Sequence, residues 1–379
     1  MTPETEDDLA ALVAEGATPF RVFGGDTRPL GAPVNAAPLS TRAMSGIDLY
    51  DPGALTMVVR AGTPLAEVET ALAAEGQRLA FEPMDHRGLL GTEGTPTIGG
   101  VVGANVSGPR RIQAGACRDF VLGVRFVDGR GQVIKNGGRV MKNVTGYDLV
   151  KLMAGSYGTL GIMTELSLKV LPDTQITNLV TLRGLDDATA IKALSRALAS
   201  PCDVTGAAHL QKGEAGAPVT MIRIEGFANS VSYRAGELQK LLAGYGEVTL
   251  DNDDESARAA WASVRDVAPF HGRPGDVWRV STKPTDGPGI VARLQDVEAI
   301  YDWGGGLVWL LVPEGSQQQT IRRAVSELGG HAMLVRGDRA SGAFQPLAGP
   351  VAALQEGLRH RFDPRGLFNP GLMTAMDAA

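Results

Sequence analysis

Glycine is concentrated in one segment of this 379-residue chain, and that segment limits what the chain can fold into. Seventeen of the 49 glycines lie between Gly88 and Gly161. Several stand beside small residues rather than in a repetitive tract, so a flexible linker explains them poorly. Glycine backbone allows a bulky ligand to come close. The segment therefore predicts a folded cradle for a cofactor that carries phosphate.

Two Gly-Gly pairs, Gly24-Gly25 and Gly99-Gly100, fit the demands of a pyrophosphate. Two negative charges need several backbone N–H groups aimed inward, which residues without bulky side chains permit. Either pair alone is typical of an ordinary turn. A nicotinamide-binding Rossmann unit fits less well, because no G-x-G-x-x-G joins a strand to a helix with an acidic residue about 20 positions later. Two such loops in this order favour FAD over NAD.

Three polar side chains beside these glycines have expected roles. Asp26 and Thr27 are expected to order the first loop by hydrogen bonds from side chain to backbone. Thr97, before the second pair, could donate its hydroxyl proton to a phosphate oxygen.

The order of motifs resembles the vanillyl-alcohol oxidase type of flavoprotein, whose FAD-binding domain is called PCMH-type. The matching stretches are FGGDT (23–27), LTMVVRAGTPLAEVETAL (55–72), TIGGVVGANVSGPRR (97–111) and FDPRGLFNPG (362–371). Within that family, SGPRR followed by GGRVMKNVTGYDLVKLMAGSYGTLG looks closest to the smaller FAD-binding subunit of bacterial glycolate oxidase. The resemblance covers nearly the whole chain.

This resemblance implies an α+β fold in three parts. Residues 1–172 form a two-part PCMH-type FAD-binding domain, residues 173–340 a ferredoxin-like α/β cap domain, and residues 341–379 a segment that returns to the FAD domain. The pattern after residue 173 agrees, because helical and strand patterns alternate and suggest two βαβ-like halves that share one sheet with helices on one face.

The resemblance also implies which residues contact FAD. They are Phe23, Gly24, Gly25, Asp26, Thr27, Pro96, Thr97, Gly99, Gly100, Asn105, Ser107, Gly108, Gly158, Gly161, Ile162 and Asn369. Of these, Asn105, Ser107 and Gly108 are expected beside the flavin ring. Relatives often attach the flavin to a His or Cys, but none stands in residues 20–30, and Cys117 is better read as a small buried residue. We expect noncovalent FAD.

Catalytic residues do not emerge from the sequence. Oxidation of a 2-hydroxy acid needs a group to hold the carboxylate, a base and a hydride path to the flavin. Catalytic relatives use a metal held by histidines, whereas the five histidines here show no pair at ligand spacing. The stretch Arg336–Arg339 keeps only the Gly-Asp of the relatives' His-containing GDGN motif. We therefore assign no metal ligand and no catalytic residue.

Two functions from different classes follow as expectations. The first is an FAD-binding subunit of a glycolate oxidase complex that oxidises glycolate to glyoxylate, with a larger homologous FAD subunit and an iron–sulfur subunit as partners. The alternative is a self-sufficient FAD-dependent dehydrogenase acting on glycolate or D-lactate. A chain that has lost flavin fits the intact loops poorly.

Composition excludes other classes. A net charge of −6 and a pI near 5.5 lack the basic excess that binding to a nucleic-acid backbone requires. The longest apolar runs are too short for a bilayer span. Two cysteines are too few to hold an iron–sulfur cluster alone. We expect a cytoplasmic protein, either free or held at the inner membrane through its partners.

Some local elements and side chains carry their own predictions. A helix over TEDDLAALVAEG should place Leu9, Leu12 and Val13 on one apolar face, and Thr63 should cap the helix that buries Leu65, Val68 and Leu72. Strands are expected at 20–23, 56–60, 121–127, 132–135 and 162–170.

Some further residues are open to more than one interpretation. Arg110-Arg111 fits an anion clamp, a subunit contact or a solvated surface pair, and His331 fits a substrate pocket or a structural role. Trp278 and Arg279 must point to opposite faces of one strand.

Overall fold

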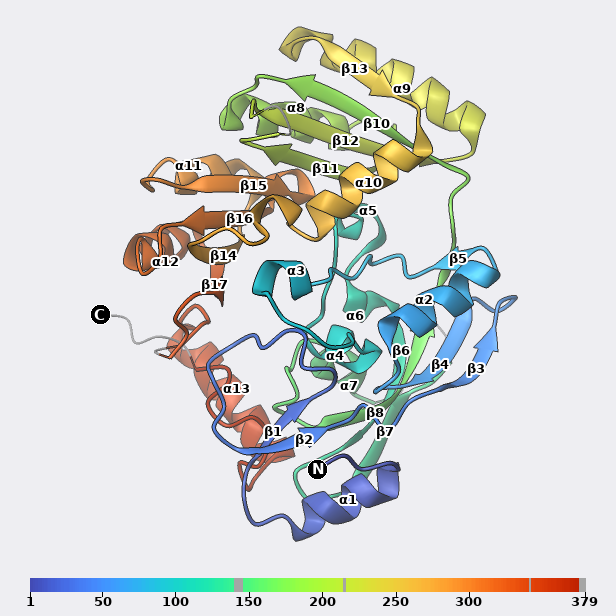
Figure 1. Cartoon of the computed structure of the whole chain (residues 1–379), viewed down its shortest axis with the longest axis vertical. Coiled ribbons are helices and arrows are strands. Elements are labelled where there is room, and N and C mark those ends of the chain that lie inside the picture. The colour runs from blue at the N-terminus through green and yellow to red at the C-terminus, as the bar shows by residue number, and fades with distance from the viewer. Residues whose placement is uncertain (140–145, 214–215, 341, 375–379) are drawn as a thin grey trace.

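The computed structural model describes residues 1–139, 146–213, 216–340 and 342–374, and its two large sheets stand one above the other in Figure 1. Part of the glycine-rich run, residues 140–145, lies outside the described residues. The lower sheet comes from the first half of the chain and the upper sheet from the second.

Helix α1 (Glu6–Glu15) begins the chain as the pattern predicted. The Thr5 hydroxyl accepts a hydrogen bond from the Asp8 N–H, and the Asp8 carboxylate accepts one from the Thr5 N–H. This capping box satisfies two backbone donors that the helix leaves free. The inner side of the helix buries Leu9 and Val13 and packs the half-buried Leu12 against the same cluster, so the predicted apolar face is confirmed.

The lower sheet has five antiparallel strands, in the order β3 (Ile47–Asp51), β4 (Thr56–Arg60), β8 (Ile162–Lys169), β6 (Val121–Val127) and β7 (Val133–Gly137). A separate parallel pair joins β1 (Phe20–Phe23) to β2 (Ala37–Ser40). The short elements around them are α3 (Arg87–Leu90), α5 (Arg111–Ala114), α6 (Cys117–Phe120), α7 (Leu149–Met153), β5 (Gln77–Arg78) and β9 (Leu171–Pro172). The expected strands of this half are confirmed. Strands β1, β4 and β6 have the expected bounds, and β7 and β8 differ from them by one or two residues.

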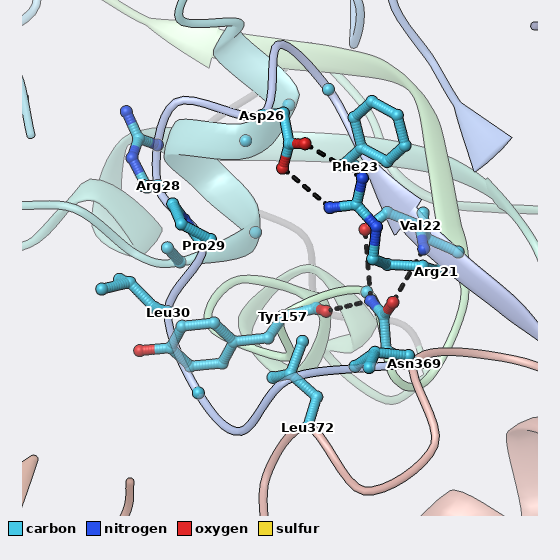
Figure 2. Close-up of a pocket in the computed structure, with 18 of the residues that line it drawn as sticks. Arg21, Val22, Phe23, Asp26, Arg28, Pro29, Leu30, Tyr157, Asn369 and Leu372 are labelled. Carbon is cyan, nitrogen blue, oxygen red and sulfur yellow. Dashed lines mark hydrogen bonds and ion pairs between the residues drawn. The ribbon is translucent and has the colours of Figure 1, made fainter. Parts of the chain in front are cut away.

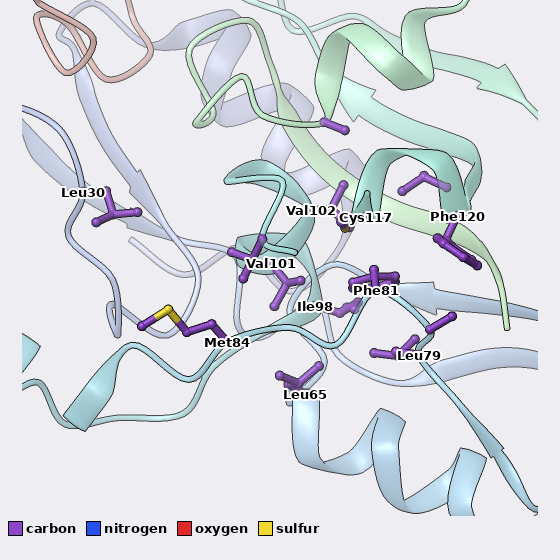
Figure 3. Packing of buried hydrophobic residues seen from close by; sticks show 14 of the residues in the cluster. Leu30, Leu65, Leu79, Phe81, Met84, Ile98, Val101, Val102, Cys117 and Phe120 are labelled. Carbon is purple, nitrogen blue, oxygen red and sulfur yellow. The ribbon is translucent and has the colours of Figure 1, made fainter. Parts of the chain in front are cut away.

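Helices α2 (Leu65–Ala74) and α4 (Ile98–Gly103) pack on one core. Figure 3 shows Ile98, Val101 and Val102 of α4 pointing toward Phe81 and Cys117.

The prediction that Thr63 caps α2 was wrong. Pro64 takes the capping position without a side-chain bond. The Thr63 hydroxyl instead donates to the Arg60 carbonyl at 2.7 Å and accepts from the Gly46 N–H at 2.9 Å. The threonine thus ties two turns together rather than starting the helix.

The upper sheet has eight strands built from two halves of the same order. The first half contains β10 (Ile176–Arg183), α8 (Asp187–Leu198), β11 (Val204–Leu210), β12 (Val219–Gly226), α9 (Ala228–Leu242) and β13 (Val248–Asp251). The second contains β14 (Asp276–Ser281), α11 (Gly287–Val291), β15 (Glu298–Asp302), β16 (Leu307–Val312), α12 (Gln318–Leu328) and β17 (His331–Arg336).

Each half is a βαββαβ unit, and the sheet order is β13-β10-β12-β11-β15-β16-β14-β17. This is the ferredoxin-like arrangement, used twice. The halves meet where β11 pairs with β15, through His209 with Tyr301 and Leu210 with Ile300. The prediction of two related halves in one sheet is confirmed.

The two faces of the upper sheet have different surroundings. Helices α8, α9, α11 and α12 share a core with one face, which includes Trp278. Helix α10 (Asp254–Arg265) departs from the one-sided pattern, because Trp261 and Val264 belong to the core shared with the first half of the chain. Figure 1 shows α10 on the side of the sheet that faces the lower part.

The chain ends beside its beginning. After α13 (Gly349–Phe362), the Phe20 N–H donates to the Leu367 carbonyl at 2.7 Å and the Asn369 N–H donates to the Phe20 carbonyl at 3.0 Å. The predicted return of the C-terminal segment is therefore confirmed. The domain limits after residues 172 and 340 stay predictions, although the two large sheets end and begin at Lys169 and Ile176, on either side of the first limit.

Candidate functional site

A pocket of about 350 Å³ opens between the first glycine loop, α4 and the C-terminal segment (Figure 2). Twelve of the predicted FAD contacts line it: Phe23, Gly24, Gly25, Asp26, Thr27, Thr97, Gly99, Gly100, Gly158, Gly161, Ile162 and Asn369. The fold thus brings together residues that are more than 340 positions apart in the sequence, since Val22 and Asn369 are hydrogen-bonded at a separation of 347.

Four predicted contacts are not among the lining residues: Pro96, Asn105, Ser107 and Gly108. The Asn105 side-chain oxygen accepts from the Arg118 N–H at 2.9 Å, and the Ser107 hydroxyl accepts from the Cys117 N–H at 2.9 Å. These bonds order the segment after α4. The role of the four residues as FAD contacts stays a prediction.

Three of the four loop glycines, Gly24, Gly25 and Gly99, are required by the packing of the protein itself. A Cβ on Gly25 would lie 1.7 Å from the Thr95 carbonyl oxygen, and one on Gly24 would lie 2.1 Å from the Thr97 hydroxyl oxygen. A Cβ on Gly99 would lie 2.6 Å from the Ala61 carbonyl oxygen. The loops are therefore packed against their neighbours so closely that any side chain would displace them. The sequence argument named only the phosphate as the reason for these glycines.

Arg28 lines the pocket but was not predicted from the sequence. Its Nε and Nη2 atoms are buried and have no hydrogen-bond partner among the described residues. Burial lowers the pKa of Arg28 to about 10. A buried cation without partners is costly, and a phosphate oxygen is a partner that guanidinium binds well. The pocket therefore fits the pyrophosphate of FAD.

The first loop is ordered differently from the expectation. Asp26 accepts two hydrogen bonds from the Arg21 guanidinium, at 2.8 and 2.9 Å, rather than bonding to backbone. Arg21 in turn lies 4.3 Å from the centre of the Phe23 ring. Figure 2 shows this chain of contacts along one edge of the pocket. The Thr27 carbonyl accepts from Thr92, which anchors the other end of the loop.

Thr97 caps α4 at the second loop. Its hydroxyl accepts from the Gly100 N–H at 3.3 Å, which leaves its proton free to donate to a phosphate oxygen.

Asn369 joins three segments at the wall of the pocket. Its side-chain oxygen accepts from the Val22 N–H at 2.7 Å, and its amide donates to the Tyr157 carbonyl at 2.9 Å (Figure 2). The residue is 1% exposed, so these bonds have no water to replace them. Because Gly158 has a φ of +67° and lies next to this amide, a side chain there would also disturb the wall.

Two side chains of the pocket lining, Arg339 and Tyr157, connect the pocket to the upper sheet. Arg339, which follows β17, lines the pocket and donates to the Pro29 carbonyl. Tyr157 lines it from the lower part and reaches the Met333 sulfur of β17 at 3.9 Å. Burial raises the pKa of the Tyr157 hydroxyl, which therefore stays protonated. Nothing in the local sequence of either residue pointed to the pocket.

The five histidines are spread over the molecule. They lie before α3 (His86), in β11 (His209), before β14 (His271), in β17 (His331) and in α13 (His360). Burial and the nearby Arg28 lower the pKa of His86 to about 3, so it is neutral. Within the described ranges, no three or more His, Cys, Asp or Glu side chains are grouped to hold a metal ion.

Cys117 lies away from the pocket lining, in the core under α4. Burial raises the pKa of its thiol, so it lacks the thiolate that covalent attachment of a flavin would use. This environment supports the expectation of noncovalent FAD.

The comparisons with known proteins agree with this geometry. A family model described as "FAD binding domain" matches residues 1–137. The "Glycolate oxidase subunit GlcE" of Escherichia coli (strain K12) is 37% identical over 362 residues, which cover 94% of this chain and 93% of that protein. The chain belongs to the GlcE family. Its cofactor is FAD, and the GlcE-type chain is a flavoprotein of the oxidoreductase class.

Other relatives share less with this GlcE-family chain. The "Glycolate oxidase subunit GlcD" of Bacillus subtilis is 31% identical over 196 residues, covering 50% of this chain and 40% of that protein. A solved structure of alkyldihydroxyacetonephosphate synthase superposes with a TM-score of 0.73 at 16% identity, covering 98% of this chain and 75% of that one. This likeness shows the PCMH-type fold. No helix in the part of the GlcE-family chain described here is long and apolar enough to cross a membrane.

Proposed function

We propose that this chain is the FAD-binding subunit of a glycolate oxidase, which supports the oxidation of glycolate to glyoxylate. The main support for this proposal is the pocket, which is lined by two glycine loops and by Arg28, whose buried guanidinium atoms have no partner among the described residues. Among the residues that the structure describes, no three His, Cys, Asp or Glu side chains are grouped to hold a metal ion, and this favours a supporting role over substrate oxidation by this chain.

Different residues of the pocket hold different parts of FAD in this proposal. Bound FAD supplies the acceptor for a hydride or for electrons. Arg28 offsets the charge of the pyrophosphate, and Thr97 donates its free hydroxyl proton to a phosphate oxygen. Gly158 and Ile162 line the pocket, and Asn369 holds the segment beside Gly158 through its hydrogen bond to the Tyr157 carbonyl.

The partners proposed for this subunit are a larger homologous FAD subunit and an iron–sulfur subunit that carries electrons onward. The proposed location is cytoplasmic, either free or peripheral at the inner membrane through these partners. We also propose that residues 1–172, 173–340 and 341–379 are the FAD domain, the cap domain and the returning segment.

The visible spectrum of the purified chain, recorded without oxygen before and after addition of glycolate, tests this function. A flavin band that stays unchanged until the partner subunits are added supports the subunit role. Bleaching by glycolate or D-lactate in the isolated chain favours the alternative, a self-sufficient dehydrogenase. A chain purified without flavin, and unable to bind added FAD, contradicts both.

A further inference from the structure

We propose that the inner face of the upper sheet carries a binding site for a small carboxylate anion, with Arg279 as its direct ligand. We call Arg279, Ser281, His331, Arg111 and Trp303 the arginine–tryptophan site. The choice of a carboxylate rests on the proposed function, whereas the site itself rests on the geometry below.

Strand alternation places Arg279 on the side of the sheet that faces the FAD pocket. Its neighbour Trp278 is buried among the helices on the opposite face. In the pairing of β14 with β17, Arg279 stands opposite Met333, and Ser281 stands opposite His331. The Tyr157 hydroxyl reaches Met333, so this face lies next to a residue of the pocket.

Two guanidinium groups converge on one indole ring. The Cζ atom of Arg111 lies 4.6 Å from the centre of the Trp303 ring, and that of Arg279 lies 5.3 Å from it. The ring is held in place because its Nε1–H donates to the Gly108 carbonyl at 3.0 Å. The aromatic face stabilises the cations but leaves their N–H donors free for an anion.

Neither guanidinium is neutralised by an acid. Across the described residues, neither Arg111 nor Arg279 takes part in an ion pair, and Arg279 makes one hydrogen bond, to the Ser281 hydroxyl at 3.3 Å. The nearby carboxylate of Glu82 is already bound by Arg110 and Arg223. Two half-buried cations at close range therefore repel each other, and an anion would relieve that repulsion.

The surrounding groups do not neutralise this positive charge. Burial lowers the pKa of Arg279, and the adjacent Arg111 lowers it further. Burial raises the pKa of the Asp302 carboxyl to about 7, so this acid is only partly charged near neutral pH. His331 has its pKa lowered by burial and by Arg279, and its neutral ring can donate one N–H and accept one hydrogen bond.

These donors match a small carboxylate. The guanidinium fork of Arg279 presents two parallel N–H groups to two oxygens of one planar group. Ser281 and His331 stand at the adjacent register position, where they can hydrogen-bond to a further oxygen of the same molecule. The site thus selects a carboxylate that carries a second oxygen function nearby.

Isothermal titration of the full-length, FAD-loaded chain with oxalate tests the proposal. We expect saturable binding in the wild type and at least about tenfold weaker binding in Arg279→Gln, because the direct ligand is lost. Arg111→Gln should weaken binding by a smaller factor, because it supplies charge rather than contacts. Arg293→Gln is the matched control, since Arg293 pairs with Glu327 on the surface and should leave oxalate binding unchanged.

Three results would overturn the site. They are absence of oxalate binding to the folded wild type, equal binding by Arg279→Gln, and sulfate binding as tight as oxalate binding. If Arg279→Gln does not fold, Arg279→Lys replaces it, with several-fold weakening expected and unchanged binding counting against the site. Flavin content is read separately, so a chain that binds oxalate but lacks FAD contradicts the proposed function and leaves the site standing.

Discussion

Arg28 and Gly25 illustrate two ways in which single residues build the FAD pocket. Gly25 is needed because the space beside its Cα is occupied by the Thr95 carbonyl. Arg28 brings a buried charge that the described residues leave without a partner. The glycine is therefore important for the folded loop before any cofactor binds, whereas the arginine is important only once an anion arrives.

Substitution of Gly25 should show whether the glycine is needed because of close packing or only because of its backbone flexibility. Gly25→Ala is expected to destabilise the loop and abolish FAD binding, because a Cβ would lie 1.7 Å from the Thr95 oxygen. Gly236→Ala is the control, since nothing lies within 4 Å of its added Cβ, and it should raise stability by about 0.5–1 kcal/mol in the middle of α9. Urea unfolding measures the stability of each variant, and the flavin content after purification measures its FAD binding. Full FAD in Gly25→Ala would refute the packing argument.

Arg28→Met should affect stability and cofactor affinity in opposite directions. Removal of an unpaired buried cation is expected to leave the stability of the FAD-free chain unchanged or to raise it. The same change should weaken FAD binding by about tenfold or more, because a charge-assisted contact to the pyrophosphate is lost. Thermal unfolding without FAD and fluorescence titration with FAD give the two values. A loss of stability without a change in FAD affinity would assign Arg28 a purely structural role.

Asp302 should make stability depend on pH. Burial raises the pKa of its carboxyl to about 7, against the opposing effects of the Trp303 N–H and of Arg223. Between roughly pH 4 and pH 7 the folded protein therefore holds a proton that the unfolded chain has released. Its contribution is greatest at the acid end and is lost as the pH rises to 7, at about 1.4 kcal/mol per pH unit.

Asp302→Asn removes this titration. The difference in unfolding free energy between wild type and variant should fall from about pH 5 to pH 7 and level off above, as urea unfolding at several pH values would show. Parallel pH profiles for the two proteins would mean that Asp302 is ionised throughout.

At the scale of elements, the sequence predicted most strands and helices from alternation, caps or turn signals, but it missed β11 and β15, which are buried on both faces. Strand β8 and helix α1 were predicted from the period of their apolar residues, and β6 from the turn signal that follows it at residues 128–131. All seven residues of β11 are buried, so its sequence shows no alternation and the strand was not anticipated. Strand β15 is buried in the same way. A strand inside a covered sheet has no solvent-facing side to mark it.

The C-terminal segment depends on one amide. In Asn369→Leu, the Val22 N–H and the Tyr157 carbonyl would lose their partners in a buried setting, at a cost of about 1–3 kcal/mol. FAD affinity should fall as well, because these residues line the pocket. Asn229→Ala, on the exposed side of α9, should change neither property. Urea unfolding with flavin titration measures both effects, and an unchanged FAD affinity would separate the segment from the cofactor site.

At the scale of the molecule, a buried network of charges joins the lower part to the upper sheet. Arg223 of β12 donates to Glu82 at 2.8 and 2.9 Å, and Glu82 also pairs with Arg110 at 3.0 Å. Arg110 pairs in turn with Glu225 of β12 at 2.5 Å. Arg110 is 5% exposed, so the reading of Arg110 as part of a solvated pair is wrong. The sequence could not reveal this network, because its members are up to 143 positions apart and each looks like an ordinary charged residue.

Removal of the Glu82 carboxylate should destabilise the contact between the lower part and the upper sheet. Burial alone would raise the pKa of Glu82, but Arg223 and Arg110 outweigh it and hold the pKa below its usual value. Glu82→Gln would leave two buried guanidinium groups short of charge, which we expect to cost about 3–5 kcal/mol in unfolding free energy. Glu237→Gln, in an exposed pair with Lys240, is the control and should be nearly neutral. Equal stabilities of the two variants would show that the network adds nothing.

The meeting of β11 and β15 has a consequence for how this protein can be divided. Each strand is one of the two edge strands of its own βαββαβ unit. Where His209 pairs with Tyr301 and Leu210 with Ile300, each strand covers a row of N–H and C=O groups of the other. A fragment that ends between the units would expose one such row on a strand that is buried along its length. Exposed flat edges of this kind recruit further strands from other molecules. Either unit produced alone should therefore self-associate. The two units protect each other's strand edges only when they belong to one chain.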